Sequence, residues 1–117
     1  MLFIPVLLIL DSIYLSIFGP TFRAMIENIQ GSELKINYIA TALCYLTLLF
    51  AFYYFIHNST KPRFNKIIDS FVLGLVIYSV YETTSHALVS KWDSKIALID
   101  TLWGSILFGL TAFITVQ

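Results

Sequence analysis

Charged side chains are scarce in this sequence. Seven Lys and Arg and seven Asp and Glu form only 12% of the 117 residues, and their formal charges cancel. The chain has no polybasic tail that would attract nucleic acid or an anionic membrane surface. We therefore expect no nucleic-acid partner.

Cysteine and the common catalytic motifs are also lacking. Cys44 is the only cysteine, so the chain cannot form an internal disulfide, and we interpret this residue as a small buried hydrophobe. The sequence contains no nucleophile elbow, phosphate loop, HExxH motif or paired CxxC motif. Enzyme classes built on these motifs therefore have no support. We predict no catalytic residues of these kinds, no metal site and no cofactor.

Long apolar runs are what the sequence has instead. Hydrophobic residues form 58% of the chain, and its mean hydropathy is +0.82, which is typical of integral membrane proteins. A crossing helix needs about 20 mainly apolar residues. Four windows come close to this length, at residues 1–18, 38–56, 67–88 and 96–116. We predict one all-α domain, a four-transmembrane-helix bundle, over residues 1–117.

A short interfacial helix is expected between spans 1 and 2. Gly19 and Pro20 should end the first span, because proline cannot continue the helical hydrogen-bond ladder. Thr21 can then cap a new helix. Its apolar residues recur at helical spacing, namely Phe22, Met25, Ile26 and Ile29. We expect this helix to rest on the bilayer surface, with a lid over a site as the alternative.

Four crossings place both termini on one side of the membrane. The basic turn at residues 57–66 lies on that side, and the other two connections lie opposite. Basic residues divide almost evenly, with Lys61, Arg63 and Lys66 near the termini and Arg23, Lys35, Lys91 and Lys95 opposite. The positive-inside rule therefore does not choose an orientation. Trp92, in the third connection, is expected to anchor the chain at the interface.

Three acidic residues interrupt the apolar windows: Asp11, Glu82 and Asp100. A carboxylate inside hydrocarbon costs about 2.5 to 3.5 kcal/mol on insertion scales, so its presence indicates a buried polar network or a function. With a rise of about 1.5 Å per residue, all three fall between mid-membrane and the side opposite the termini. They can share one zone of depth if their helices turn them inward.

Further polar residues follow the acids along the helices. Tyr78, Glu82 and His86 are spaced at i, i+4 and i+8, so Glu82 and His86 can hydrogen-bond directly. Gly104 offers a small surface where a neighbouring helix can approach closely. The candidates for binding a ligand or a proton are therefore Asp11, Glu82, His86, Asp100, Tyr78 and Trp103.

The spans contain no lysine or arginine that could neutralise these carboxylates. Like charges in a low dielectric repel, so at least one carboxyl is expected to hold a proton near neutral pH. The alternatives are a charged His86, an external cation, or a basic side chain reaching in from the interface. A purely structural role is equally open, since buried acids also join helices by accepting hydrogen bonds from Tyr, Trp, Ser and Thr.

Several segments together resemble the signature of the DUF2177 membrane proteins. They are Tyr81-Glu82-Thr83-Thr84-Ser85, then Trp92, then Asp100-Thr101-Leu102-Trp103-Gly104, with Leu10-Asp11-Ser12-Ile13-Tyr14-Leu15 near the start. The family pattern has aspartate, asparagine and tryptophan where this chain has Glu82, Ser85 and Tyr14. The resemblance covers nearly the whole chain and implies four spans, with Asp11, Glu82, Asp100 and Trp103 as shared polar positions. It implies no reaction, and such proteins occur in bacteria and in large DNA viruses of eukaryotes.

Three functions are open from the sequence. The first is proton- or cation-linked transport or permeation through the acid cluster, by a homo-oligomer because four short helices enclose little volume. The second is a structural or assembly role in a membrane, such as a viral membrane, in which the acids only hold the helices of the bundle together. The third is a lipid-modifying enzyme with Glu82 and His86 as an acid–base pair. The bilayer is the common partner in all three.

Overall fold

The computed structural model describes all 117 residues, and its regular structure is entirely helical. The helices are α1 (Phe3–Gln30), α2 (Tyr38–Phe52) with its π-helical continuation η1 (Tyr53–His57), α3 (Arg63–Leu88) and α4 (Ser94–Thr115). Four helices, with η1 counted in the second, are long and apolar enough to cross a membrane. The longest dimension is 48 Å, close to the roughly 40 to 45 Å of a bilayer with its headgroups. The predicted four-helix membrane architecture is confirmed.

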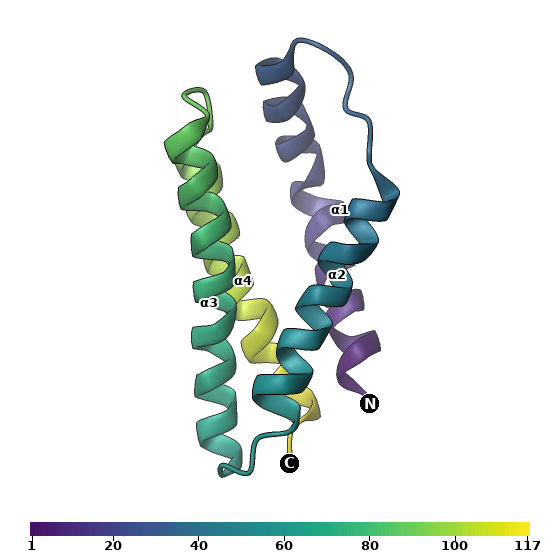
Figure 1. Cartoon of the computed structure of the whole chain (residues 1–117), viewed down its shortest axis with the longest axis vertical. Helices are drawn as coiled ribbons and strands as arrows, with labels where there is room; N and C mark the ends of the chain where they lie inside the picture. Colours follow the sequence, from purple (N-terminus) through teal and green to yellow (C-terminus); the bar gives the residue numbers. More distant parts are fainter.

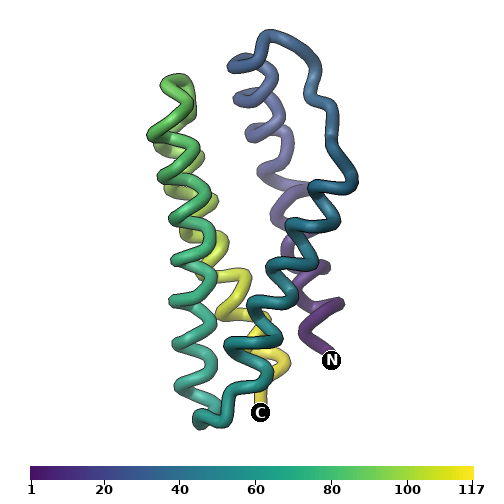
Figure 2. The backbone as a smooth tube through the Cα atoms, in the orientation of Figure 1, coloured from purple at the N-terminus to yellow at the C-terminus, as the bar shows by residue number.

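The helices alternate in direction, so both termini lie at one end of the molecule (Figure 1). The connection between α2 and α3 lies at that same end, and the other two connections lie at the opposite end (Figure 2). This is the topology that four crossings predict. We refer to the two ends as the terminal end and the opposite end.

The separate interfacial helix was a wrong prediction. Pro20 lies inside α1, which continues without a break to Gln30. A proline removes one backbone hydrogen bond, and membrane helices tolerate this loss when other contacts compensate. Here Met25 is buried, and its sulfur accepts the backbone N–H of Asp93 at 3.4 Å. This contact joins the second half of α1 to the α3–α4 connection.

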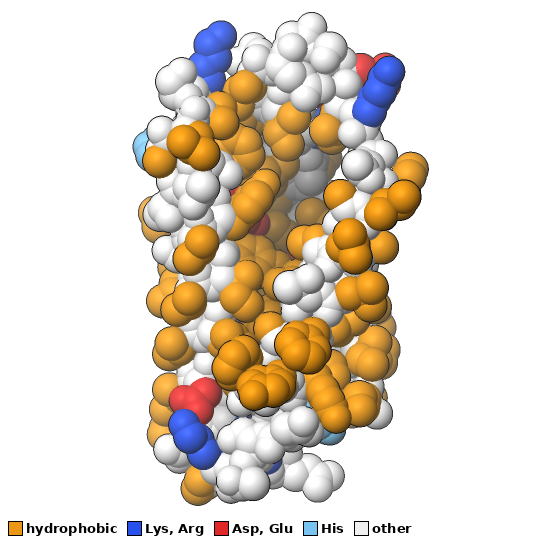
Figure 3. All heavy atoms as spheres, viewed as in Figure 1, with side chains coloured by type: hydrophobic (Ala, Val, Ile, Leu, Met, Phe, Trp, Pro, Cys, Tyr) orange, Lys and Arg blue, Asp and Glu red, His pale blue; other side chains and the backbone are white.

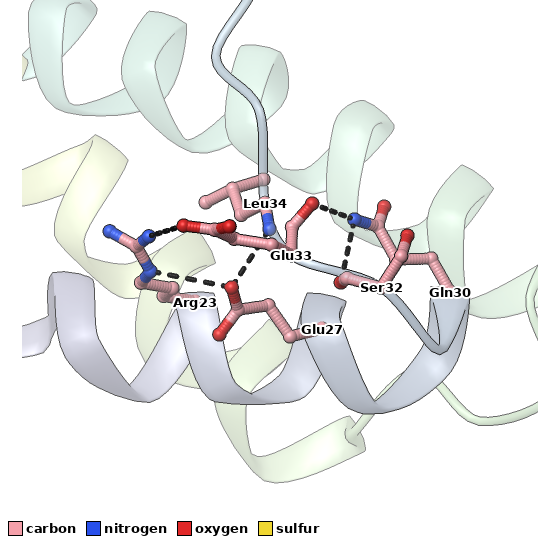
Figure 4. A network of polar contacts seen from close by, with 6 residues as sticks. All are labelled: Arg23, Glu27, Gln30, Ser32, Glu33 and Leu34. Carbon is pink, nitrogen blue, oxygen red and sulfur yellow. Dashed lines mark hydrogen bonds and ion pairs between the residues drawn. The ribbon is translucent and has the colours of Figure 1, made fainter.

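The end of α1 is closed by side chains from its last two turns (Figure 4). Gly31 has a φ of 70°, and its N–H donates to the carbonyl of Glu27. The Glu27 carboxylate accepts the N–H of Leu34 at 2.8 Å and lies 3.5 Å from Arg23, which also pairs with Glu33. These contacts turn the chain sharply and direct it toward α2.

Helices α3 and α4 form the most closely packed pair, because glycines let their backbones meet. A Cβ atom at Gly74 would collide with the backbone carbonyl of Gly104, and one at Gly104 would collide with the ring of Tyr78. The Ser70 hydroxyl donates to the carbonyl of Phe108 at 2.6 Å across the same interface. The pair is therefore a scaffold whose two backbones cannot move apart without losing these contacts.

The apolar core lies toward the terminal end and joins α1, α2, η1 and α4. Its buried members are Phe3, Leu7, Leu48, Phe52, Ile56, Leu107, Phe108, Ala112 and Val116. Helix α3 contacts η1, but α2 itself separates from α3 toward the opposite end (Figures 1 and 2). The half of the bundle that carries the acids is therefore the more open half.

Candidate functional site

Asp11 joins three helices through its two carboxylate oxygens. This side chain of α1 is only 6% exposed. Its Oδ1 accepts the indole N–H of Trp103, on α4, at 3.0 Å, and its Oδ2 accepts the hydroxyl of Tyr45, on α2. Both oxygens of this acid therefore have a donor.

Asp100 faces back from α4 toward α1. Its Oδ1 accepts the hydroxyl of Tyr14 at 3.1 Å. The ring of Tyr14 stacks on that of Trp103, with centroids 4.7 Å apart and an interplanar angle of 7°. Two neighbouring aromatic side chains thus connect the carboxyl groups of Asp11 and Asp100.

Glu82 on α3 is almost completely buried, at 1% exposure. Its Oε2 accepts the indole N–H of Trp92 at 2.9 Å. Its Oε1 is buried without a donor, and its carboxyl group lies close to that of Asp100. Two ionised carboxylates can only accept, so this contact becomes a hydrogen bond only when one of the two holds a proton.

Of the six candidates from the sequence, five lie around this cluster, and His86 lines a recess beside Glu82 without a hydrogen bond to it. Tyr78 lines the same cleft as Asp100, and its ring covers Gly104. The direct bond between Glu82 and His86 is absent. The Nδ1 of His86 instead lies 3.1 Å from the carbonyl oxygen of Trp92, and the indole N–H of Trp92 donates to Glu82.

Three donors of the cluster were missed as site residues: Tyr14, Tyr45 and Trp92. Tyr14 lies one turn from Asp11, and this spacing was the only local signal for it. Trp92 lies in the α3–α4 connection, and its indole donates to Glu82, a contact that we did not predict. No local spacing links Tyr45 or Trp92 to an acid, since both contacts depend on how separate elements pack.

A cleft of about 500 Å³ opens between α2, α3 and α4 beside Asp100. Its lining residues are Cys44, Thr47, Leu48, Ile77, Tyr78, Tyr81 and Asp100. Figure 3 shows the hollow in the half opposite the termini, with acidic side-chain atoms visible inside it. The interpretation of Cys44 as a buried residue was wrong, since its side chain is exposed along this cleft.

A second recess, of about 390 Å³, lies on another face of the α3–α4 pair. Glu82 lines it together with mainly small and polar residues, namely Ser79, Thr83, His86, Ala87, Ser94, Ala97, Leu98 and Thr101. Glu82 thus borders one recess and Asp100 borders the other.

No basic side chain pairs with the three acids. Arg23 pairs with Glu27 and Glu33 near the opposite end, and Lys61 pairs with Asp69 at 2.8 Å. No group of three His, Cys, Asp or Glu side chains lies close enough to hold a metal ion. The cluster can therefore bind a proton or hold hydrogen bonds, but it does not offer the donor set of a metal centre.

Comparison with known proteins places these residues in a wider group. Neither a curated protein nor a solved structure matches the chain. One family does match, over residues 1–117, and its description is "Predicted membrane protein (DUF2177)". The match covers the whole chain, including every residue of the acid cluster, and agrees with the four apolar helices. The chain therefore belongs to the DUF2177 family of predicted membrane proteins.

Proposed function

We propose that this membrane protein binds a proton at the pair formed by Glu82 and Asp100 and uses it in transport or permeation. One observation carries the proposal: the Oε1 atom of Glu82 is buried without a donor beside a second carboxyl group. A buried acceptor without a donor raises the free energy of the folded state. A proton shared between the two carboxyl groups supplies that donor and needs no additional volume.

The surroundings of the pair favour exchange of that proton. Both oxygens of Asp11 are occupied by donors, whereas Glu82 and Asp100 each border a recess. The absence of a nearby basic side chain leaves the proton as the available positive charge. A proton is favoured over a metal ion because the acids do not form a metal-binding group. Since four helices enclose little volume, we expect the active form to be a homo-oligomer.

Proton flux into liposomes tests this function. The purified protein is reconstituted with a pH-sensitive dye inside the vesicles, and a pH gradient is applied with and without a counter-ion ionophore. We expect flux with the parent protein and its loss in Glu82→Gln and Asp100→Asn. Asp69→Asn is the matched control, because it removes a carboxylate of α3 outside the cluster. Equal flux with and without protein would remove the proposal.

A structural role is the second candidate, and a specific observation favours it. Tyr14 and Trp103 donate across the α1–α4 interface, so the acids also join the helices. This role predicts that Asp11→Asn and Asp100→Asn lower thermal stability in detergent while all variants show the same flux as empty liposomes. No comparable observation favours an enzyme, because His86 bonds to the carbonyl oxygen of Trp92 and forms no hydrogen bond with Glu82.

A further inference from the structure

The cleft beside Asp100 has the size and lining of a small-molecule site. Its volume is about 500 Å³, inside the range of about 300 to 1,000 Å³ for ligand pockets. Five of its seven lining residues are hydrophobic, and Asp100 is the only acid among them. Such pockets bind an apolar body and orient it with a few polar groups. The apolar wall and the single carboxyl define the chemistry of an occupant.

Charge complementarity makes that occupant a cation. The cluster contains three acids, the Oε1 atom of Glu82 is buried without a donor, and no salt bridge reaches any of the three. An inorganic cation would need several oxygen ligands, but no group of three ligating side chains is present. The tyrosine rings at 78 and 81 instead suit an organic ammonium group, which is attracted to the faces of aromatic rings.

The position of the cleft indicates how such a molecule reaches it. Helices α2 and α3 separate above the apolar core, and the hollow opens on the face seen in Figure 3. Tyr81 and Cys44, which line it, are both exposed. Because α2 and α3 are membrane-spanning helices, the opening faces lipid, and an occupant with an apolar body can enter from the bilayer.

We propose that the cleft between α2 and α3 binds a lipophilic organic cation, an amine or quaternary ammonium compound with an apolar body, with Asp100 as its counter-charge. The proposal rests on the proposed function, because it names the cargo of the same acid pair. Binding replaces one positive charge by another. The cation binds beside the two ionised carboxylates of Glu82 and Asp100, and the proton that they shared is released to solvent. Proton and cation therefore compete for one site.

The groups that set this competition come from every helix around Asp100. Glu82 and Tyr78 face it from α3, and Asp11 and Tyr14 face it from α1. The remaining titratable groups that line the cleft are Tyr81 on α3 and Cys44 on α2. Glu82 and Asp100 are the pair in contact, so one proton is released for each cation bound, and affinity rises as the pH is raised.

Isothermal titration of the purified protein in neutral detergent tests the proposal with two probes. Phenyltrimethylammonium carries a permanent charge, and tert-butylbenzene is its uncharged isostere. We expect saturable binding of the cation only, with release of about one proton when the titration is repeated in buffers of different ionisation enthalpy. Equal binding of the two probes, or no saturable binding of the cation, overturns the proposal.

Three variants separate a site from general adsorption. Asp100→Asn should weaken cation binding at least tenfold, and Asp69→Asn should leave it unchanged. Cys44→Phe keeps every acid and fills the cleft, so we expect this variant to lose cation binding as well. That result does not depend on whether the Asp100→Asn variant folds. Binding that survives both Asp100→Asn and Cys44→Phe overturns the proposal.

Cys44 also reports occupancy directly, since it is the only cysteine and lines the cleft. Bound phenyltrimethylammonium should slow its alkylation by N-ethylmaleimide at least threefold, and tert-butylbenzene should not. The same preparation is used for proton flux, which keeps the two proposals apart. Flux without cation binding or protection overturns the cleft site alone. Cation binding without proton release or flux overturns the proton-linked function, and with it the exchange between proton and cation.

Discussion

Tyr14 and Trp103 stack nearly parallel, and each donates a hydrogen bond to the carboxylate on the other's helix. Tyr14 of α1 donates to Asp100 of α4 at 3.1 Å, and Trp103 of α4 donates to Asp11 of α1 at 3.0 Å. The arrangement is reciprocal, so a slip of one helical turn, about 5.4 Å, would break both bonds together. It fixes the relative height of two helices whose other contacts are mainly apolar.

Tyr14→Phe should destabilise the protein, because it removes the donor to Asp100 while keeping the stacked ring. Hydrogen bonds within membrane bundles contribute about 0.6 kcal/mol on average and up to about 1.7 kcal/mol, and we expect the upper part of this range for a buried acid. Unfolding in detergent, followed by circular dichroism, measures the change. Tyr38→Phe is the control, since Tyr38 is 78% exposed. Equal losses of stability in Tyr14→Phe and Tyr38→Phe would contradict a stabilising hydrogen bond between Tyr14 and Asp100.

Gly74→Ala should be more damaging than Tyr14→Phe. The added Cβ would meet the backbone carbonyl of Gly104, which cannot rotate away as a side chain can. The α3–α4 pair must then separate, and overpacking of this kind costs about 1 to 3 kcal/mol or more. Gly19→Ala is the matched control, because nothing lies within 4 Å of a Cβ there. We expect Gly19→Ala to be neutral or mildly stabilising, as judged by melting temperature and by recovery of folded protein.

Arg63 holds the terminal ends of α3 and α4 together. Its Nη2 donates to the carbonyl of Phe113 at 2.8 Å, its Nε donates to that of Val116 at 3.2 Å, and its guanidinium lies 5.1 Å from the centroid of the Phe113 ring. Phe113 belongs to the last turn of α4 and Val116 is its C-cap residue, so neither carbonyl has a helical donor. Arg63→Gln should therefore lower stability by about 1 kcal/mol. Lys66→Gln, which removes a basic residue of the same turn, should change the melting temperature less.

The number of spans could be predicted because a bilayer imposes a length on every apolar helix. What the local pattern could not supply was the course of the chain at Pro20. A Gly-Pro pair usually ends a helix, but here α1 continues to Gln30, and Met25, beyond the proline, contacts Asp93. That contact joins residues far apart in the sequence, so no window of neighbouring residues could reveal it.

The acid cluster could also be predicted only in part. The rise along a helix placed Asp11, Glu82 and Asp100 in one zone of depth without knowledge of their neighbours. Their partners depend on how each helix is rotated about its axis, and on how a connection folds. Trp92 reaches Glu82 from the α3–α4 connection, and its place in that connection gave no sign of which acid it would contact.

Glu82→Gln should abolish the pH dependence of stability that the shared proton creates. In the parent, a pair that keeps one proton binds more protons when folded than its two ordinary carboxyls bind when unfolded. Stability is then fully present at acidic pH and falls as the pH rises, by at most about 1.4 kcal/mol per pH unit. In Glu82→Gln the side-chain amide can donate to Asp100 in place of the proton, so this contribution disappears. The total slope becomes shallower while the fold remains, because Asp100 is still buried.

The measurement is the free energy of unfolding in detergent between pH 5 and pH 8 for the parent, Glu82→Gln and Asp69→Asn. Asp69 pairs with Lys61 at 2.8 Å and lies near the terminal end of α3, outside the cluster. Asp69→Asn should therefore keep the slope of the parent. If the parent and Glu82→Gln share one slope, no proton bridges Glu82 and Asp100. The unpaired Oε1 atom would then be a tolerated cost of packing α3 against α4, and the proton-linked function would lose its only structural support.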